Sequence, residues 1–392
     1  MTASTSERPA AVVSAKGAAR WAAGHPWIYR SDVLGEPGAE PGVVRVRDRR
    51  GKFLGQALYS PRSEIRLRLI ETTERPLDRA WWVSRLRAAL ARRAGIDATA
   101  CRIVHGEGDG LPSLIVDRYD RWVVAQLLSA GLETMRADVI AAIVEVTGAE
   151  GVLLRNDAGV RRHEGLKEQV ELAWGAVPRS VEVREGEVRF LAAPWTGQKT
   201  GAFLDQRLNR LIAGELTRPG GEALDCFSYH GSFALHLARR AARVTAIDSS
   251  AEALERGAEN AALNGRTNIE WLEADAFEAL RGFERSRRKF DVVVVDPPAF
   301  AKSKAALAGA LRGYHEINLR AMRILAPDGV LVTASCSFHL RRAEFMEMLA
   351  AAAADSGRRL RLERLLGQDV DHPEVLTIPE TGYLKGAVLR AD

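Results

Sequence analysis

The sequence predicts an α/β protein whose largest domain is a doubly wound, mostly parallel sheet. From residue 223 to the C-terminus, short apolar segments alternate with helical segments, which is typical of this architecture. The segment 291–295 contains four consecutive valines, as expected for a strand that is buried on both faces. Aspartates stand at the ends of several segments, where such a sheet binds its ligands.

Length and composition fit two or three domains of a globular protein. The 392 residues are 46% apolar and 27% charged, and no apolar run approaches the ~20 residues of a membrane span. Residues 1–10 lack the apolar core of a signal peptide. The three cysteines are far apart, which argues against disulfides or a zinc site. We therefore expect a cytoplasmic protein with no metal site and no membrane partner.

The net charge of +5 is unevenly distributed. Residues 1–79 carry 14 Lys/Arg against 9 Asp/Glu, so this stretch holds the whole excess of positive charge. A basic module beside a neutral body indicates a polyanion such as nucleic acid as partner, although a solvated charged surface is an alternative.

The N-terminal stretch, residues 1–76, is predicted to be a small β-rich domain with strands at 44–47, 53–58 and 65–69. Arginines at every second position share one face of these strands, opposite the aliphatic residues. Upstream aromatics lie beside arginines, a mixture that can stack on bases or belong to the core. The candidate nucleic-acid contacts are Arg20, His25, Trp27, Arg45 and Arg47.

Pro76 marks a boundary, and residues 77–180 are predicted to form an α+β middle domain. A helix over 77–94 would turn Trp81, Leu86 and Leu90 inward. A second helix is expected at 132–146. Strands are expected at 101–104, 113–117, 122–128, 152–154 and 170–172. No catalytic chemistry is predicted here, and a hairpin over 183–188 leads into the last domain.

In the last domain, residues 181–392, the predicted strands are 223–226, 243–247, 269–273, 291–295, 330–334, 360–365 and 384–389. A helix over 251–264 begins after Ser250 and ends before Gly265. Each of the first four strands carries an aspartate at or near its end. These residues are Asp225, Asp248, Asp275 and Asp296.

Four acids in register favour a ligand site, although a single acid at a strand end is usually a helix cap. The turn after the first strand contains only Gly231, so the glycine pattern of a dinucleotide-binding turn is absent. This argues for a nucleoside cofactor without a diphosphate. Asp248 is placed to take ribose hydroxyls, and Asp275 to meet an adenine amino group beside an apolar residue.

Several motifs occur together. Residues 199–207 read Lys-Thr-Gly-Ala-Phe-Leu-Asp-Gln-Arg, 296–300 Asp-Pro-Pro-Ala-Phe, 335–337 Ser-Cys-Ser, 371–373 Asp-His-Pro and 382–386 Gly-Tyr-Leu-Lys-Gly. With residues 24–27 and 106–112, they make the chain resemble the PUA-domain ribosomal RNA large-subunit cytosine-C5 methyltransferases over nearly its whole length. The resemblance implies a PUA domain, a small α+β insertion and a class I methyltransferase domain. It also implies S-adenosylmethionine as cofactor and large-subunit ribosomal RNA as partner, and it leaves a homodimer open.

The resemblance also implies roles for individual residues. Phe203, Gln206 and Arg207 would flank the methionine end of the cofactor, and Phe227, Ser228 and Gly231 would line it, with Ser228 and Gly231 offering backbone groups. Asp248 would take the ribose, and Asp275, Ala276 and Phe277 the adenine. Asp296 belongs to both the cofactor site and the catalytic site. Where the family often has Thr-Gly-Gly, this chain has His230-Gly231-Ser232, so the His230 side chain has no assigned role.

Cys336 follows the fifth strand and is the predicted nucleophile. Cytosine C5 reacts poorly until a thiolate adds to C6, and Asp296 near N3 would stabilise charge in that adduct. The sequence shows no group that would favour the thiolate. Cys101 and Cys226 are interpreted as buried bystanders, and Ala299 stands where related enzymes carry a second cysteine.

Two other functions stay open. The Asp-Pro-Pro-x-Phe motif resembles that of amino-group methyltransferases, so the substrate could be another RNA base, such as guanine; Cys336 argues for cytosine. A non-catalytic RNA-binding assembly factor with this fold is the second alternative, and the intact strand-end acids argue against it. The missing glycines disfavour a dehydrogenase.

Overall fold

The computed structural model describes residues 9–301, 303 and 305–392, and these form two compact units. Among the described residues, the first unit comprises 9–183, Ala192–Leu204 and Val370–Thr381. The second comprises Arg184–Leu191, Asp205–Asp369 and Gly382–Asp392. The domain boundaries expected after residues 76 and 180 stay predictions.

A six-stranded sheet in the order β2-β6-β5-β4-β1-β3 is found in the described N-terminal part of the chain. Val44 and Val46 are buried whereas Arg45 and Arg47 are half-buried, so the expected alternation along this strand is confirmed. The elements are β1 (Ala10–Val13), α1 (Ala15–Ala22), β2 (Trp27–Tyr29), η1 (Arg30–Asp32), β3 (Val33–Gly35), β4 (Gly42–Arg47), β5 (Phe53–Tyr59) and β6 (Ile65–Glu71).

The arginines of β6 do not form an open basic face, which corrects the expectation for residues 65–69. Arg68 is buried and donates to Glu164 Oε1 at 2.8 Å. Arg66 is also buried, and it pairs with Glu36 at 3.1 Å. Alternation along a strand shows which residues share a face. It does not show that Glu164 and Glu36, which are distant in the sequence, cover that face.

The middle of the chain forms a five-stranded sheet, β11-β10-β9-β8-β7, among the residues that the structure describes. Helix α2 begins after Asp78, whose side chain caps it, and Leu90 is only half-buried. The helix expected at 132–146 is divided between α3 and α4, because the chain leaves the helical path at Thr134 and Met135. The elements are α2 (Arg79–Ala91), β7 (Ala100–His105), η2 (Gly106–Asp109), β8 (Leu114–Tyr119), β9 (Trp122–Leu127), α3 (Ala130–Glu133), α4 (Arg136–Thr147), β10 (Gly151–Asn156), α5 (Val160–His163) and β11 (Gln169–Gly175).

The second unit contains the expected doubly wound sheet. Within the described residues it has seven strands in the order β16-β15-β14-β17-β18-β20-β19, and only β20 runs antiparallel to its neighbours. The elements from the hairpin onward are β12 (Val181–Glu185), β13 (Val188–Ala192), η3 (Leu204–Gln206), α6 (Arg207–Leu216), β14 (Glu222–Cys226), α7 (Ser232–Leu237), β15 (Arg243–Asp248), α8 (Ala251–Leu263), β16 (Ile269–Glu273), α9 (Ala276–Arg285), β17 (Phe290–Val295), α10 (Leu307–Arg323), β18 (Leu325–Ser335), α11 (Arg342–Ser356), β19 (Leu360–Leu366), η4 (Pro379–Thr381) and β20 (Lys385–Ala391).

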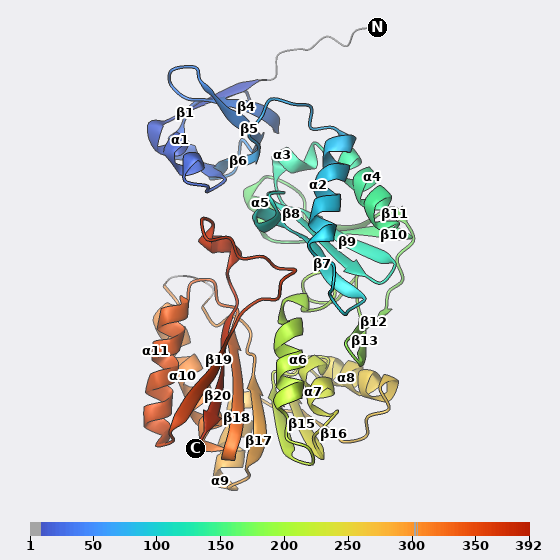
Figure 1. Cartoon of the computed structure of the whole chain (residues 1–392), viewed down its shortest axis with the longest axis vertical. Helices are drawn as coiled ribbons and strands as arrows, with labels where there is room; N and C mark the ends of the chain where they lie inside the picture. Colours follow the sequence, from blue (N-terminus) through green and yellow to red (C-terminus); the bar gives the residue numbers. More distant parts are fainter. Residues whose placement is uncertain (1–8, 302, 304) are drawn as a thin grey trace. The chain divides into compact units, whose positions relative to one another are not determined.

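The four valines of β17 are buried on both faces, as predicted. Val293 and Val295 pack in a core with residues of α9, α10 and α11. Val292 and Val294 pack in a core on the other face, with residues of α6 and α7. Figure 1 shows these helix groups on opposite sides of the sheet. The strand order reverses between β14 and β17, which is where sheets of this class bind ligands beyond their carboxyl ends.

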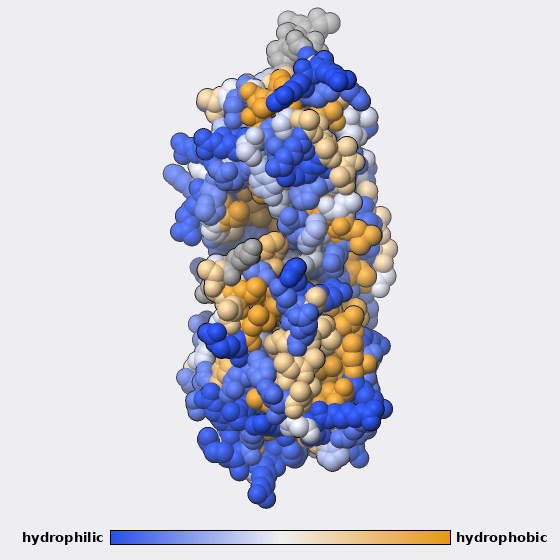
Figure 2. Space-filling model, turned by 90° about the vertical axis from the view of Figure 1, so that its left-hand side faces the viewer, coloured by the Kyte–Doolittle hydropathy of each residue, from blue (hydrophilic) through white to orange (hydrophobic). Residues whose placement is uncertain are grey.

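The surface is a mixture of polar and apolar side chains. Figure 2 shows one face, where hydrophilic residues predominate and apolar ones lie in patches between them. Across the residues that the structure describes, no helix combines the length and the apolar character needed to cross a bilayer.

Candidate active site

The loop after β14 has an unusual backbone. Phe227, Tyr229 and Gly231 all have positive φ, at 63°, 49° and 79°. This conformation costs roughly 1–2 kcal/mol for a residue with a Cβ atom. Hydrogen bonds hold it, since Ser228 N donates to Ile247 O and Tyr229 N donates to Asp248 Oδ2, both at 2.8 Å. The chain therefore adopts a glycine-type turn at two positions without glycine, and such strain is typical of functional loops.

Gly231 itself is required by packing. A Cβ atom built at this position would lie 2.4 Å from the indole ring of Trp271. Together with the positive φ, this contact makes any side chain there costly. The close approach that the sequence suggested for a cofactor is thus made by Trp271, and a contribution of the Gly231 backbone to cofactor binding stays a prediction.

His230 is part of the core. Its ring stacks on Phe190 with centroids 5.5 Å apart, and Asn260 Nδ2 donates to its carbonyl oxygen at 3.0 Å. Burial lowers the pKa of His230 to about 4, so the imidazole is neutral at physiological pH. The His230 side chain therefore packs in the core against Phe190.

Three of the four strand-end acids share one environment. Asp225 is fully buried, and its Oδ2 accepts a hydrogen bond from Ala234 N at 2.9 Å. Burial raises the pKa of Asp225 well above its usual range, and the charges of Asp296 and Asp248 add to this effect. The fourth acid, Asp275, is exposed and caps α9 by accepting from Glu278 N at 3.0 Å. The local geometry of Asp275 is that of a helix cap, which was the alternative interpretation of a strand-end acid.

The three residues expected near the methionine end of the cofactor each have different neighbours. Gln206, the N-cap residue of α6, donates from Nε2 to Asp296 Oδ1 at 2.8 Å, which joins the start of α6 to the residue after β17. Arg207 is buried and pairs with Asp369 at 2.5 Å. Phe203 belongs to the first unit, where Lys199 Nζ lies 4.7 Å from the centre of its ring.

The residues expected near the adenine lie at the start of α9. Ala276 is buried and Phe277 is half-buried, directly after the cap residue Asp275. The Phe277 ring lies 6.1 Å from that of Phe300 in the Asp-Pro-Pro-Ala-Phe segment. An apolar wall therefore connects the end of β16 with the loop that follows β17.

Unsatisfied polar atoms support a ligand at these strand ends. Asp225 Oδ1 and Ser228 Oγ are buried, and neither has a hydrogen-bond partner among the described residues. Buried polar atoms without partners are costly, so they suit a cofactor that brings its own donors and acceptors. The acids, the strained loop and the aromatic wall fit the nucleoside cofactor that the sequence predicts.

Cys336 directly follows β18 and is half-buried, whereas Cys101 and Cys226 are buried. Burial raises the pKa of the Cys226 thiol, which makes it a poor nucleophile. Strand β18 pairs with β17 in parallel register, with Thr333 opposite Val295. The residues after both strands, Cys336 and Asp296, therefore leave the same edge of the sheet.

A hydrogen-bond network holds the two residues that flank Cys336. The Tyr314 hydroxyl accepts from Ser335 Oγ at 2.9 Å and lies 2.8 Å from Ser337 Oγ. Ser337 Oγ also accepts from Ala301 N at 3.1 Å. Through Ser337, the Ser-Cys-Ser segment is hydrogen-bonded to Ala301 in the loop that begins at Asp296.

Lys385 is a residue of this site that the sequence reasoning missed. It lies opposite Ser335 in the β18–β20 pairing, it is 4% exposed, and its Nζ donates to the carbonyl oxygens of Ser337 and Leu340 at 2.6 and 2.7 Å. Burial lowers the pKa of Lys385 to about 8, and the neighbouring Cys336 acts in the opposite direction. The sequence contains the Gly-Tyr-Leu-Lys-Gly motif, but only the pairing of β20 with β18 places its lysine beside the cysteine.

The candidate nucleic-acid contacts are largely engaged by acids of the first unit. Arg20 pairs with Asp32 at 3.4 Å, His25 with Glu380 at 3.1 Å, and Arg45 with Glu74 at 3.0 Å. The indole N–H of Trp27 donates to Glu107 at 2.9 Å. Arg47 is half-buried on the same face as Arg45. These residues remain candidates, but a phosphate would have to compete with carboxylates already in place.

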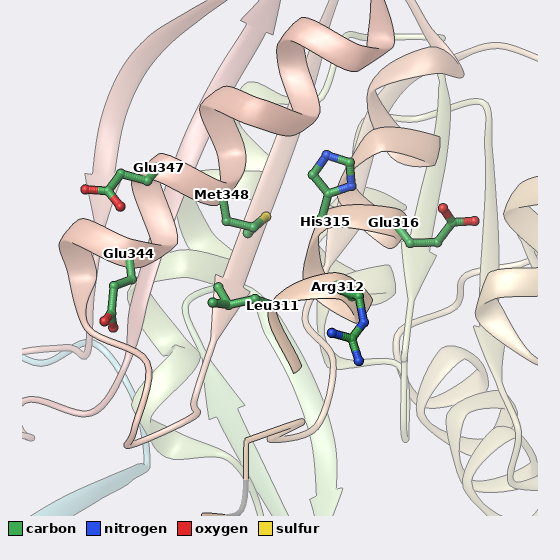
Figure 3. Close-up of a pocket in the computed structure, with 7 residues that line it drawn as sticks. All are labelled: Leu311, Arg312, His315, Glu316, Glu344, Glu347 and Met348. Atoms are coloured by element: carbon green, nitrogen blue, oxygen red, sulfur yellow. The ribbon is translucent and has the colours of Figure 1, made fainter. Parts of the chain in front are cut away.

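A surface hollow of about 550 Å³ is found in the second unit. Figure 3 shows that Leu311, Arg312, His315 and Glu316 line it from α10, and Glu344, Glu347 and Met348 from α11. None of the strand-end acids, nor Cys336, lines it. Within the described residues, no group of three or more His, Cys, Asp or Glu side chains is arranged to hold a metal ion.

Comparisons with known proteins identify the family and support the fold. Residues 12–72 match a PUA-like domain, and residues 163–376 match an S-adenosylmethionine-dependent methyltransferase. The chain is 39% identical over 380 residues to the ribosomal RNA large subunit methyltransferase I of Aeromonas hydrophila, covering 94% of this chain and 95% of that protein. It is 40% identical over 377 residues to the protein of the same name from Vibrio campbellii, covering 92% and 94%. A candidate methyltransferase solved in complex with SAH superposes with a TM-score of 0.83 at 18% identity, over 97% of this chain and 100% of that chain, which supports the fold.

Proposed function

The chain belongs to the S-adenosylmethionine-dependent methyltransferase family that includes the ribosomal RNA large subunit methyltransferase I proteins, and from this premise we propose that it methylates C5 of a cytosine in large-subunit ribosomal RNA. The observation that carries the proposal is the half-buried Cys336, held between two braced serines at the sheet edge where Asp296 also lies. A thiol in this place has no function in methylation of an amino group.

The reaction uses Cys336 as a temporary covalent partner of the base. The thiolate adds to C6 and forms a C–S bond, and the C5–C6 electrons become available at C5. When bound, S-adenosylmethionine would supply an electrophilic methyl group to C5, and its S–CH3 bond would break to leave S-adenosylhomocysteine. A base then removes the C5 proton, the double bond re-forms, and the thiolate leaves. Negative charge develops at N3 as the thiolate adds, so Asp296 would act in its protonated form, giving N3 a proton and taking it back when the thiolate leaves.

Lys385 explains how a thiolate is available at neutral pH. A free cysteine titrates near 8.5, and an adjacent cation lowers that value. The Lys385 ammonium group donates to the carbonyl oxygens of Ser337 and Leu340, which follow Cys336 in the chain. It also interacts electrostatically with Cys336. This geometry suits a cation that stabilises the thiolate before attack and again when it leaves.

The cofactor would be held by residues of several strand ends. Ser228 and Gly231 offer backbone groups, Asp248 takes the ribose, and Asp275, Ala276 and Phe277 surround the adenine. Phe203, Gln206, Arg207 and Phe227 would complete the site. Gln206 carries the clearest support among them, because its amide already contacts Asp296 and so connects the cofactor side to the substrate side.

The partner is ribosomal RNA of the large subunit, in the cytoplasm, where ribosomes are assembled. Its contacts would include the basic N-terminal module, with Arg20, His25, Trp27, Arg45 and Arg47 as candidates. The target cytosine must leave its stack to reach a thiol at the sheet edge, so a loop or partly unfolded RNA suits this enzyme better than a duplex.

Mapping of 5-methylcytosine tests this function. Ribosomal RNA is compared between cells with the gene, without it, and with the gene restored as Cys336→Ala. We expect one cytosine to lose its methyl group in the deleted strain and to stay unmethylated with the variant. Loss of a methylated guanine or of an amino-group methylation in the deleted strain would instead identify the alternative substrate.

A further inference from the structure

The chain reverses direction directly after Cys336, in a tight turn over residues 337–340. Leu340 N donates to Ser337 O at 3.1 Å, which closes the turn. Phe338 and His339 are therefore its two central residues. Turns are usually built from Gly, Pro, Asn, Asp or Ser, so nothing in turn formation calls for a phenylalanine here.

Both ends of the turn are anchored. Lys385 Nζ donates to the carbonyl oxygens of Ser337 and Leu340, and the Leu340 side chain is 1% exposed. Ser337 is further held through its N–H and its hydroxyl by Ser335, Tyr314 and Ala301. The ends cannot move without breaking a buried network, so the tip is presented in a fixed position.

The tip carries an exposed aromatic ring. All Phe, Tyr and Trp side chains lie in the described residues, and only Phe338, at 55%, and Trp174, at 52%, are exposed. Phe338 packs edge-on against His339, with centroids 5.5 Å apart and planes at 81°. Leaving a phenyl ring in water is unfavourable, so a partner with an apolar flat face would stabilise it.

We propose that Phe338 is an RNA-stacking residue, which packs against an unpaired base next to the target cytosine. This inference rests on the proposed function, because the partner at Cys336 is then an extruded nucleotide. Bases flanking an extruded nucleotide lose a stacking neighbour, and an aromatic ring two residues from the nucleophile can replace it. The exposed Arg341 and Arg342 follow the turn; Arg341 pairs with Glu344 at 2.8 Å, so a phosphate of the same strand would have to compete with that carboxylate.

The test uses the full-length protein and a short single-stranded RNA with 2-aminopurine beside its only cytosine. Stacking on Phe338 quenches the 2-aminopurine fluorescence of the parent complex. Phe338→Ala is expected to remove the quenching and to weaken binding by about 5- to 100-fold, whereas Phe338→Trp retains both. The dependence of binding on salt stays unchanged, because no phosphate contact is lost. Trp174→Ala, an equally exposed ring in the other unit, serves as the matched control and should bind like the parent.

Three results would overturn the inference. They are unchanged affinity and quenching for Phe338→Ala, weaker binding with quenching retained, and a change in oligomeric state in sedimentation, which would make the ring a contact with a second copy. The assay needs no turnover, so Cys336→Ala should quench like the parent. If that variant still methylates RNA, the proposed mechanism fails while the stacking result stands.

Discussion

The ammonium group of Lys385 lies 2.6 Å from the carbonyl oxygen of Ser337, the residue that follows the predicted nucleophile. Its other hydrogen-bond partner among the described residues is the carbonyl of Leu340. A buried lysine that is bound to carbonyl oxygens keeps a positive charge without a paired carboxylate. That charge is available to a neighbouring thiolate, and Cys336 is the neighbour.

Replacing Lys385 by methionine should therefore raise the pH at which the enzyme becomes active. The variant keeps the length of the side chain but loses the charge, so the thiol titrates at higher pH. An opposite charge typically shifts a pKa by about 1–3 units, and the midpoint of the single-turnover rate should move upward by a similar amount. Cofactor affinity should not change. A midpoint that stays in place would show that Lys385 only anchors the turn.

The pH dependence of stability gives an independent check that the pKa of Lys385 is lowered in the folded chain. Burial lowers the pKa of Lys385 to about 8 in the folded chain, whereas an unfolded lysine titrates near 10.4. Between these values the unfolded chain binds more protons, so this group makes the free energy of unfolding rise with pH. In denaturant titrations between pH 8 and 10, the parent should gain stability relative to Lys385→Met.

Asp248→Ala should weaken S-adenosylmethionine binding by about 1–3 kcal/mol, through loss of charge-assisted hydrogen bonds to the ribose. The carboxylate also holds the strained loop, because it accepts from Tyr229 N. Asp248→Asn is the matched control, since it can keep the contact with Tyr229 but loses the charge. Isothermal titration should rank the parent above Asp248→Asn and Asp248→Ala last. Equal affinities for all three would remove Asp248 from the cofactor site.

Gly231→Ala should destabilise the fold by roughly 2–4 kcal/mol, combining left-handed strain with overpacking against Trp271. The two contributions can be separated in a Trp271→Leu background, where the added methyl group no longer meets the indole ring. We expect the cost of Gly231→Ala, measured by thermal or denaturant unfolding, to fall in that background. The same cost in both backgrounds would mean that strain alone requires glycine.

Replacing Arg45 and Arg47 together by glutamine should flatten the salt dependence of RNA binding. Each lost phosphate contact lowers the slope of log K against log salt by about 0.7–0.9, so the double variant should lose about 1.5. Deleting the N-terminal module is a poorer experiment, because Glu164 would remain buried without Arg68. An unchanged slope would show that these arginines do not contact phosphate, as expected if Arg45 stays paired with Glu74 in the complex.

The local sequence pattern was sufficient to predict the strands of the last domain. Four valines in a row identified β17, and the expected strand segments all correspond to strands of the sheet. The positive φ of Phe227 and Tyr229 could not be predicted, because neither residue favours it and distant hydrogen bonds impose it. The place of Lys385 required the strand order, since β20 inserts antiparallel beside β18.

The same limit explains the N-terminal module. Alternation correctly placed Arg45 and Arg47 on one face, and it placed Arg66 and Arg68 in the same way. It could not show that Glu164, about a hundred residues later, covers Arg68. Charge counted along a sequence therefore overstates the charge that is available to a partner, whenever acids from other elements pack against it.

The covalent step of the proposed mechanism can be trapped directly. A cytosine with fluorine at C5 can receive the methyl group, but it then has no C5 proton to lose. Elimination stops, and Cys336 should remain bonded to C6 of the RNA. With S-adenosylmethionine and fluorinated RNA we expect a protein–RNA band that resists denaturant. Cys336→Ala should give no such band and essentially no turnover, while it keeps its cofactor affinity.

Cys226→Ala is the matched control, because that thiol is buried with a raised pKa and should be dispensable for the chemistry. Full methylation by Cys336→Ala would exclude the cysteine mechanism and favour an amino group or guanine as the methyl acceptor.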